Sequence, residues 1–437
     1  MKRVLVCLLV IMIVLASCGK KADPASDSIT VTVMWQQLND RNIENWNKYM
    51  IGPFQEAFPN IRIDFQPTPN WMDAIRVQLS AGRGPDMFMT EAAEPFEFFL
   101  GGRLLDLTNY VKKYNWDGLI FGWALKQFNT NGVQFAIPHS YEGLLYWYNE
   151  DIYRANNIPV PTTRAEFVAA MQGFQSRGIT PVAYGTLGRP EMNNFLVTNY
   201  LNMYSGPEAV AKLLRGELKW TDTLIMDAMR LMNADWQAGY YQDKRSFAVT
   251  NPDSRALFFQ GRAATLTEGT WVPMILPQDG ITFNMKSTYN PSMRDGVVST
   301  IPIGMGAALC INANANPRAA DAAAEFINFL YNDEKNIIAS MAAGEQPLCR
   351  PLDMSLLPSS MNLAYREMYE LMDEAARQGR MSYTNYGFFP GGLASYVYED
   401  IDKVFIGDMT VEEYCGNCQR LLDQAFAEGW VSYIGDR

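Results

Sequence analysis

Residues 29–89 switch repeatedly between two hydrophobic periods, and this switching constrains the fold more than any other feature of the chain. Three short segments have the alternation or apolar run of a strand: 29–35, 61–65 and 87–89. Helical spacing separates them, in 43–51 and again at Met72, Ile75 and Leu79, with an interruption expected at Gly52-Pro53. Because parallel strands need crossover connections, this order predicts a parallel sheet covered by helices, an α/β fold.

The same pattern resumes later in the chain, which predicts a second α/β unit. Further strand-like segments are 135–138, 180–185 and 263–267, and 143–149 is either a buried strand or a helix entry. Thr163 and Glu166 form a capping box for a helix that ends at Gly178, and Asn316-Pro317 begins another helix. The roughly 400 residues that follow the N-terminal segment exceed one ordinary hydrophobic core. We therefore expect two α/β lobes.

Polar and aromatic residues follow several of the predicted strands directly. They are Trp35, Gln36, Gln37, Thr90, Glu91, Gly185 and the segment from Glu268 to Trp271. Open α/β sheets bind ligands in the crevice beyond the carboxyl ends of their strands. Two lobes that face each other across these ends would form a cleft for a small molecule.

The N-terminal segment predicts export and lipidation. Lys2 and Arg3 precede an apolar run over 4–15, which is shorter than the roughly 20 residues of a membrane-spanning helix. Residues 15–18 read Leu-Ala-Ser-Cys, which resembles the lipobox of bacterial lipoproteins. That resemblance implies a signal peptide over 1–17, lipidation of Cys18, and a polar tether over 18–28. An ordinary signal peptide with an incidental cysteine is the alternative.

Composition excludes several classes of function. The formal net charge is −11 and the isoelectric point is near 4.8, with no cluster of Lys or Arg, which argues against a nucleic-acid partner. His139 is the one histidine of the chain, which excludes multi-histidine metal sites. Neither a phosphate-binding G-x-x-x-x-G-K-[ST] loop nor a G-x-S-x-G nucleophile motif occurs. We expect no catalytic residues, no metal and no cofactor.

Four cysteines remain beyond the N-terminal segment: Cys310, Cys349, Cys415 and Cys418. Four thiols allow three disulfide pairings, and the sequence does not choose among them. Cys418 shares a helical face with apolar residues after a capping box at Thr410 and Glu413, which favours a core thiol. A redox C-x-x-C pair, or half of a zinc site, is the alternative interpretation.

Eight segments in order resemble the extracellular solute-binding proteins of ABC transporters, in the sugar-binding branch that includes maltose-binding protein. They are the lipobox, 54–63, 84–88, 102–107, 136–138, 145–153, 259–271 and 323–330. The resemblance implies a two-lobe clamshell of type II whose chain crosses three times between lobes at a hinge. One lobe would hold 29–138 and about 285–345, and the other 139–284 and about 346–437. Arg164 stands where the family usually has an aromatic residue, and we expect only a local packing difference there.

The resemblance also implies which residues contact a sugar. Trp271 would stack on a sugar ring, Glu268 would supply a neighbouring polar contact, and Tyr396 would be a further aromatic platform. The other expected contacts are Trp35, Gln36, Gln37, Thr90, Glu91, His139, Tyr141, Arg189 and Glu191. A pyranose has an apolar C–H face and a hydroxyl rim, so aromatic, carboxylate and amide groups suit it.

The resulting hypothesis is a monomeric, lipid-anchored receptor outside the cytoplasm that passes a carbohydrate, expected to be an oligosaccharide, to a membrane permease. Three alternatives stay open. The same fold can bind a non-sugar solute, or the receptor can serve a sensor in place of a permease. A secreted carbohydrate-active enzyme could use two carboxylates such as Glu91 and Glu268, which would need to lie about 5 to 10 Å apart.

Overall fold

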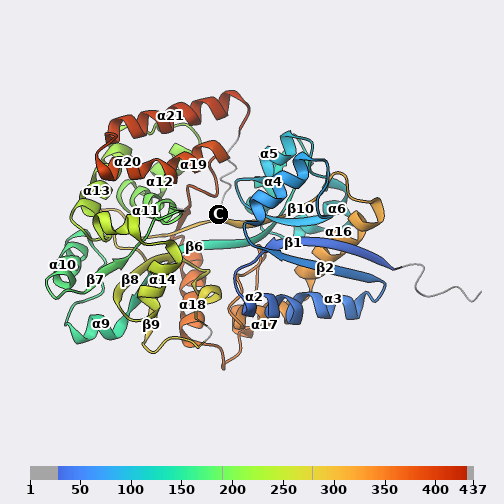
Figure 1. The fold of residues 1–437 in the computed structure, drawn as a ribbon, viewed down its shortest axis with the longest axis horizontal. Helices are drawn as coiled ribbons and strands as arrows, with labels where there is room; N and C mark the ends of the chain where they lie inside the picture. The colour runs from blue at the N-terminus through green and yellow to red at the C-terminus, as the bar shows by residue number, and fades with distance from the viewer. Residues whose placement is uncertain (1–27, 189, 278, 431–437) are drawn as a thin grey trace, which may run out of the picture.

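The computed structural model describes residues 28–188, 190–277 and 279–430, and every structural statement below refers to these residues. Two halves lie side by side, joined by strands that run through the centre of the molecule (Figure 1). The signal peptide and Cys18 lie outside the described residues. Among the helices described, none is long and apolar enough to cross a membrane.

One mixed sheet runs through both halves. Its strands follow the order β2-β1-β3-β10-β6-β8-β7, with β11 paired to β10 and β9 paired to β6. Their bounds are β1 Ile29–Gln36, β2 Ile61–Thr68, β3 Met87–Glu91, β6 Ile137–Asn149, β7 Thr180–Ala183, β8 Ala263–Gly269, β9 Met285–Thr288, β10 Ile301–Ile311 and β11 Met381–Tyr383. A separate two-stranded ribbon joins β4 Asn129–Thr130 to β5 Val133–Gln134.

Helices cover the sheet in both halves (Figure 1). Those of the first half are α2 Asp40–Asn45, α3 Gly52–Ala57, α4 Trp71–Ser80, α5 Pro95–Leu100, α6 Thr108–Tyr114, α7 Trp116–Leu119, α8 Gly122–Gln127, α16 Pro317–Asn332 and α17 Glu334–Ala342. The remaining helices are α9 Glu150–Ala155, α10 Arg164–Gln175, α11 Met192–Tyr200, α12 Pro207–Leu214, α13 Thr223–Gln237, α14 Asn251–Phe259, α15 Val272–Ile275, α18 Leu363–Arg377, α19 Gly391–Glu399, α20 Ile401–Ile406 and α21 Val411–Ala427.

The strand–helix order of residues 29–89 predicts parallel strands, and the structure confirms this arrangement. β1 pairs in parallel with both β2 and β3. Asp86, at the entry to β3, accepts hydrogen bonds from the backbone N–H and the hydroxyl of Thr32 at 2.9 and 2.7 Å. This contact fixes the start of β3 against the middle of β1, so both strands point their carboxyl ends toward the same edge.

The predicted interruption at Gly52-Pro53 is wrong, because the chain stays helical from α2 to α3. A π-helical segment, Trp46–Ile51, connects them, and the Gly52 N–H donates to the Asn47 carbonyl. The wider turn changes the hydrogen-bond register. Pro53 lies in the first turn of α3, where its lack of an N–H costs no hydrogen bond within that helix. The π-helical segment turns Trp46 toward the centre of the molecule.

β6 and β10 carry the chain from one half to the other. Residues 137–143 of β6 pair with β10, whereas 144–149 pair with β8 and β9. The segments 135–138 and 143–149, expected to be separate, therefore belong to one region built around a single 13-residue strand. The β6–β10 ladder shifts register between Met305 and Ala307, so Gly306 forms a bulge at the crossing.

The pairing of β9 concerns the lobe boundary that the sequence places at about residue 285. This strand pairs with residues 146–149 of β6, on the edge opposite to the one that pairs with β8. The sequence division placed residues from about 285 onward with the first half. The pairing joins 285–288 to residues of β6 that also pair with β8.

The helix that follows Thr163 begins at the predicted capping box. It also contains an ion pair that the sequence did not predict. Thr163 and Glu166 form the capping box. Arg164 makes a two-pronged ion pair with Asp235 on α13, and Tyr200 also donates to the Asp235 carboxylate. Asp235 is 2% exposed. The departure at Arg164 is therefore a partly buried ion pair and not only a change in packing.

The cysteines fit the core interpretation. Cys310, Cys349, Cys415 and Cys418 are all buried free thiols. Burial raises the pKa of Cys310 and of Cys415 to about 12, because a thiolate would lose its hydration. Within the described part of the chain, the His, Cys, Asp and Glu side chains form no group that could hold a metal ion.

We expect Arg164→Met to lower the free energy of unfolding by about 3 kcal/mol, because it leaves the Asp235 carboxylate buried without its cation. Chemical denaturation measures this change. Arg215→Met is the matched control, since Arg215 forms an exposed pair with Glu217 and should cost no more than about 1 kcal/mol. Equal effects of the two substitutions would contradict a structural role for the Arg164–Asp235 pair.

Candidate ligand-binding site between the two halves

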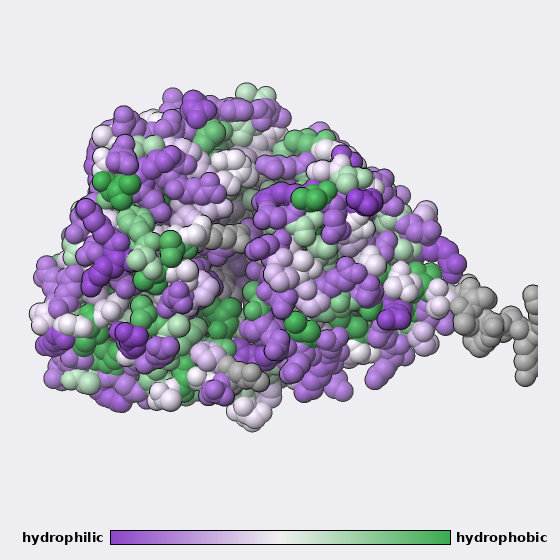
Figure 2. All heavy atoms as spheres, viewed as in Figure 1, coloured by the Kyte–Doolittle hydropathy of each residue, from purple (hydrophilic) through white to green (hydrophobic). Residues whose placement is uncertain are grey.

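A cavity lies where the two halves of the described structure face each other. Its volume is about 270 Å³, and residues of both halves line it. Figure 2 shows the surface hollowed between the halves. The carboxyl ends of β1 and β3 open onto this cavity, as the sequence predicts for the ligand crevice of an α/β sheet.

Aromatic rings form the first wall. Trp35 is the next-to-last residue of β1, and its ring centroid lies 4.1 Å from that of Trp46 in the π-helical segment. His139 meets Trp35 edge-on at 5.1 Å between ring centroids. Trp71 fixes its indole by donating to the Met89 carbonyl at 3.1 Å. All four residues line the cavity, so this wall presents several flat faces.

Trp271 dominates the second wall. It lines the cavity, is only half-buried, and lies with its ring centroid 4.9 Å from that of Phe195 on α11. The indole folds back over Gly269, the last residue of β8. A Cβ atom added at Gly269 would lie 2.0 Å from the ring, so only glycine allows this placement.

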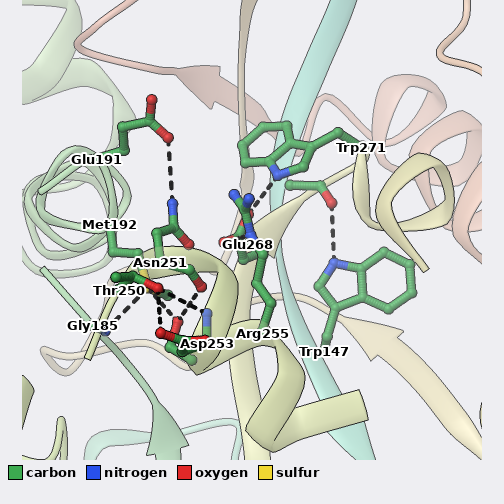
Figure 3. Close-up of polar contacts among 12 residues, drawn as sticks. Trp147, Gly185, Glu191, Met192, Thr250, Asn251, Asp253, Arg255, Glu268 and Trp271 are labelled. Carbon is green, nitrogen blue, oxygen red and sulfur yellow. Dashed lines mark hydrogen bonds and ion pairs between the residues drawn. The ribbon is translucent and has the colours of Figure 1, made fainter. Parts of the chain in front are cut away.

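Glu268 and Arg255 lie behind Trp271 and hold it in place. The Arg255 guanidinium donates to the two Glu268 carboxylate oxygens at 2.7 and 3.1 Å. The Trp271 Nε1 donates to the same carboxylate at 2.5 Å. Figure 3 shows these three side chains together, with Trp147 hydrogen-bonded nearby. Glu268 is fully buried, and its carboxylate contacts Arg255 and Trp271.

Carboxyl and amide groups lie between the two walls. Glu142 on β6 accepts a hydrogen bond from the Gln346 amide at 3.3 Å, and Gln346 accepts one from the Ser140 hydroxyl at 3.1 Å. Burial raises the pKa of Glu142 to about 8, and the nearby carboxylates of Glu91 and Glu268 add to this shift. A neutral Glu142 side chain both donates and accepts hydrogen bonds.

A second carboxyl group lies beside the first wall. Glu345 accepts hydrogen bonds from the side-chain amides of Asn42 and Asn45, each at 2.8 Å. Burial raises the pKa of Glu345 to about 7, and these two amides act in the opposite direction. The cavity therefore contains two carboxyl groups whose pKa values burial moves toward neutrality.

A bridge joins the two halves next to Trp271. Arg41 on α2 donates to the backbone carbonyls of Pro273, Met274 and Leu276 at 2.9 to 3.1 Å. Asn39 donates to the Met274 carbonyl at 2.9 Å. These carbonyls belong to the short helix α15 and its end, directly after Trp271. The position of the Trp271 segment is thus tied to the first half.

The structure brings part of the predicted site together. The predicted residues that line the cavity are Trp35, Gln36, Glu91, His139, Glu191 and Trp271. Thr90 is fully buried beside Cys310, and Tyr141 packs against Phe121, so neither reaches the cavity. Gln37 is exposed outside it. Arg189 lies outside the described residues.

Tyr396 and Glu268 also lie outside the lining. Tyr396 stacks on Tyr414 of α21 at 5.7 Å between ring centroids. The reason is helical periodicity: α19 turns Ala394, Ser395 and Tyr398 toward the cavity, and Tyr396 lies on another face. Glu268 is bound by Arg255 and Trp271 and does not face the cavity, as the glycosidase alternative with Glu91 would need.

Several lining residues were missed by the sequence interpretation: Trp46, Trp71, Glu142, Phe195, Arg255, Glu345 and Tyr386. Glu142 had a local signal, because a carboxylate inside a long apolar strand is unusual. Arg255 and Phe195 had none, since their approach to Trp271 depends on how α14 and α11 pack against β8.

Comparison with known proteins identifies the family. The profile of the bacterial extracellular solute-binding protein family matches residues 40–337. The chain belongs to this family. The members of this family are solute-binding proteins rather than enzymes. The family's extracellular location also agrees with the export signal expected at the N-terminus.

Individual relatives of this solute-binding protein are distant. An uncharacterized ABC transporter extracellular-binding protein of Pyrococcus horikoshii is 21% identical over 280 residues, 60% of this chain and 64% of that protein. A probable sugar-binding periplasmic protein of Rhizobium meliloti is 28% identical over 121 residues, 27% of this chain and 28% of that protein. The chain therefore spans less than two thirds of the length of these curated relatives.

Solved structures confirm the two-lobe fold. The structure of a chitin oligosaccharide binding protein matches with a TM-score of 0.78 at 19% identity, covering 92% of this chain and 100% of that one. The predicted α/β clamshell architecture is thus confirmed for nearly the whole chain.

The contact between Gly269 and Trp271 predicts a specific coupling between the two positions. Gly269→Ala should lower the free energy of unfolding by about 1–3 kcal/mol, because the new methyl group collides with the indole. In a Trp271→Ala background the ring is gone, so the same change should cost much less. Chemical denaturation of the four proteins of this double-mutant cycle measures the coupling. An equal cost in both backgrounds would show that the indole does not lie over Gly269.

Proposed function

We propose that this solute-binding protein captures a carbohydrate of oligosaccharide length in the cavity between its two lobes. It then delivers this ligand to the permease of an ABC importer. One observation carries this proposal. Aromatic faces stand on both walls, with Trp35 and Trp46 on one and Trp271 on the other, and amide and carboxyl groups lie between them. This arrangement matches the two surfaces of a pyranose, an apolar C–H face and a rim of hydroxyls.

The comparisons support a sugar ligand. One curated relative is a probable sugar-binding periplasmic protein, and one of the solved structures that resemble the chain over its length is a chitin oligosaccharide binding protein. A site whose buried polar groups pair with particular hydroxyls rejects analogues that lack them. Glu142, Gln346 and Ser140 form such a set in this cavity.

The two lobes would close over the ligand. We propose that one lobe holds residues 29–138 and about 300–345, and the other 139–299 and about 346–437. This keeps the division drawn from the sequence except for 285–299, which follow β9 into the second lobe. A ligand that touches both walls favours the closed arrangement, because only there does it contact both lobes.

The proposed place of action is the outer face of the bacterial membrane, with the protein held as a monomer by a lipid on Cys18. The lipobox-like residues 15–18 and the polar segment 19–28 support this anchor. A tether of this length would leave both lobes free to meet the permease. A single acyl chain binds a membrane only marginally, whereas several chains hold a protein firmly.

The test of sugar capture is isothermal titration calorimetry with mono- and oligosaccharides, first on the parent and then on two tryptophan variants. Trp271→Ala should weaken binding of any sugar that binds the parent by at least about tenfold, because it removes an aromatic face from the cavity wall. Trp147→Phe is the matched control. Trp147 is fully buried and donates to the Gly269 carbonyl at 3.2 Å, so its loss should lower stability and not affinity.

Three outcomes would contradict the proposal. They are binding of no sugar, parental affinity in Trp271→Ala, and an equal loss of affinity in both variants.

The anchor has its own test. Cys18→Ala should release the protein from the membrane fraction of the producing cell into the soluble fraction, because no thiol remains for lipidation. Fractionation followed by immunoblotting measures this. Cys415→Ala serves as the control, since that thiol is buried in α21 and should not change the distribution. A Cys18→Ala protein that stays with the membrane would show that another feature anchors the chain.

A further inference from the structure

The charges that line the cavity are strongly unbalanced. Among the described lining residues, five are glutamates and one is an arginine, with lysine absent. The glutamates are Glu91, Glu94, Glu142, Glu191 and Glu345. The single histidine adds no positive charge, because burial lowers the pKa of His139 to about 3. The cavity therefore has an excess of negative or ionisable groups.

The one lining cation does not offset this excess. Arg255 is engaged by both oxygens of Glu268, a sixth carboxylate directly behind the wall. Glu94 pairs with Arg76 at 2.6 Å, outside the lining. Glu345 accepts hydrogen bonds from neutral amides, and the Arg41 cation, which lies outside the lining, also acts on it. A neutral sugar would leave this imbalance in place, whereas a cationic ligand would reduce it.

Glu142 is the lining glutamate on which other carboxylates of the site act. It projects from β6 where β6 crosses β10, and the bulge at Gly306 makes room for it, since a Cβ atom there would lie 2.8 Å from the Glu142 Oε2. The charged groups that act on it are Glu91 from β3 and Glu268 from β8, both carboxylates. Its neutral neighbours are Gln346, Tyr386 and the Cys349 thiol.

Two further observations describe the cation that would fit. Within the described residues, the acidic side chains do not converge into a group that could hold a metal ion, so the negative groups are spread along the cavity wall. The Nδ1 atom of His139 is buried in the same wall without a hydrogen-bond partner. Spread carboxylates between aromatic faces suit an organic ring that carries an ammonium group, because such a cation also interacts with aromatic faces.

We propose that the ligand is an amino sugar with a free ammonium group, and that Glu142 is the carboxylate that receives this ammonium. The inference rests on the proposed carbohydrate function and deepens it. Charge-assisted hydrogen bonds between an ammonium and a carboxylate are stronger than those between neutral groups. The amino sugar should therefore bind more tightly than the matched neutral sugar.

The experiment compares sugars that differ only at carbon 2 of each ring. The pairs are glucosamine and glucose, galactosamine and galactose, and mannosamine and mannose, together with the β-1,4-linked trisaccharides of glucosamine, N-acetylglucosamine and glucose. Isothermal titration calorimetry is run at pH 6.5. In each set that binds, the member with the free amine should bind at least about tenfold more tightly than its neutral partner.

The role of Glu142 is tested by Glu142→Gln, which keeps the shape of the side chain. The preference for the amine should fall to less than about threefold in this variant. Glu208→Gln is the control, because it removes the same charge from an exposed position on α12 and should keep the parental preference. The readout is the ratio of two affinities, which a general loss of folding or binding does not change.

Proton release gives a second readout. Binding of an ammonium beside Glu142 should lower the raised pKa of that carboxyl group, so the free protein, protonated at pH 7, should lose a proton on binding. Titrations at pH 7 in two buffers of different ionisation enthalpy measure the protons released. The parent should release them with glucosamine sugars, and Glu142→Gln should release fewer.

The results separate this inference from the proposed function. Equal affinities within every sugar set, or a preference that survives Glu142→Gln, would overturn the amino-sugar inference while leaving carbohydrate capture intact. Binding of a linear polyamine such as spermidine without binding of any sugar would overturn both.

Discussion

The site depends on one shared strand. β6 pairs with β10 over its first residues and with β8 and β9 over its last, so this one strand continues the mixed sheet from one half into the other. The side chains of His139, Ser140 and Glu142 line the cavity from the part of β6 that pairs with β10. The bulge at Gly306 interrupts the ladder there. The residues at the centre of the cavity therefore stand on the element that links the lobes, which connects ligand contact to lobe position.

The position of Trp271 in the second wall depends on a buried ion pair. Arg255 and Glu268 lie under Trp271, and Gly269 provides the space into which the indole folds. A buried ion pair contributes little net stability, but removing one partner is costly, so it fixes geometry more than it adds energy. Arg41 then ties the segment after Trp271 to the opposite half, which aligns the two aromatic walls.

Much of the fold followed from sequence patterns, and part of the site did too. Periodicity predicted the parallel β1, β2 and β3, and with them Trp35 and Glu91 at strand ends. The family resemblance pointed to Tyr396, but the sequence did not show which face of α19 it occupies: Tyr396 stacks on Tyr414, whereas Ser395 lines the cavity. Arg255 could not be found, because its meeting with Glu268 depends on the packing of α14 against β8. Local periods predict elements, whereas contacts between elements need the structure.

The central claim is that the cavity between the lobes is where a carbohydrate binds. The most direct measurement is a crystal structure of the protein with a sugar chosen from the calorimetric screen. The account predicts electron density for the sugar between Trp271 on one wall and Trp35 and Trp46 on the other, within hydrogen-bond distance of Glu142. Density for the saturating sugar elsewhere on the protein, with this cavity empty, would contradict it.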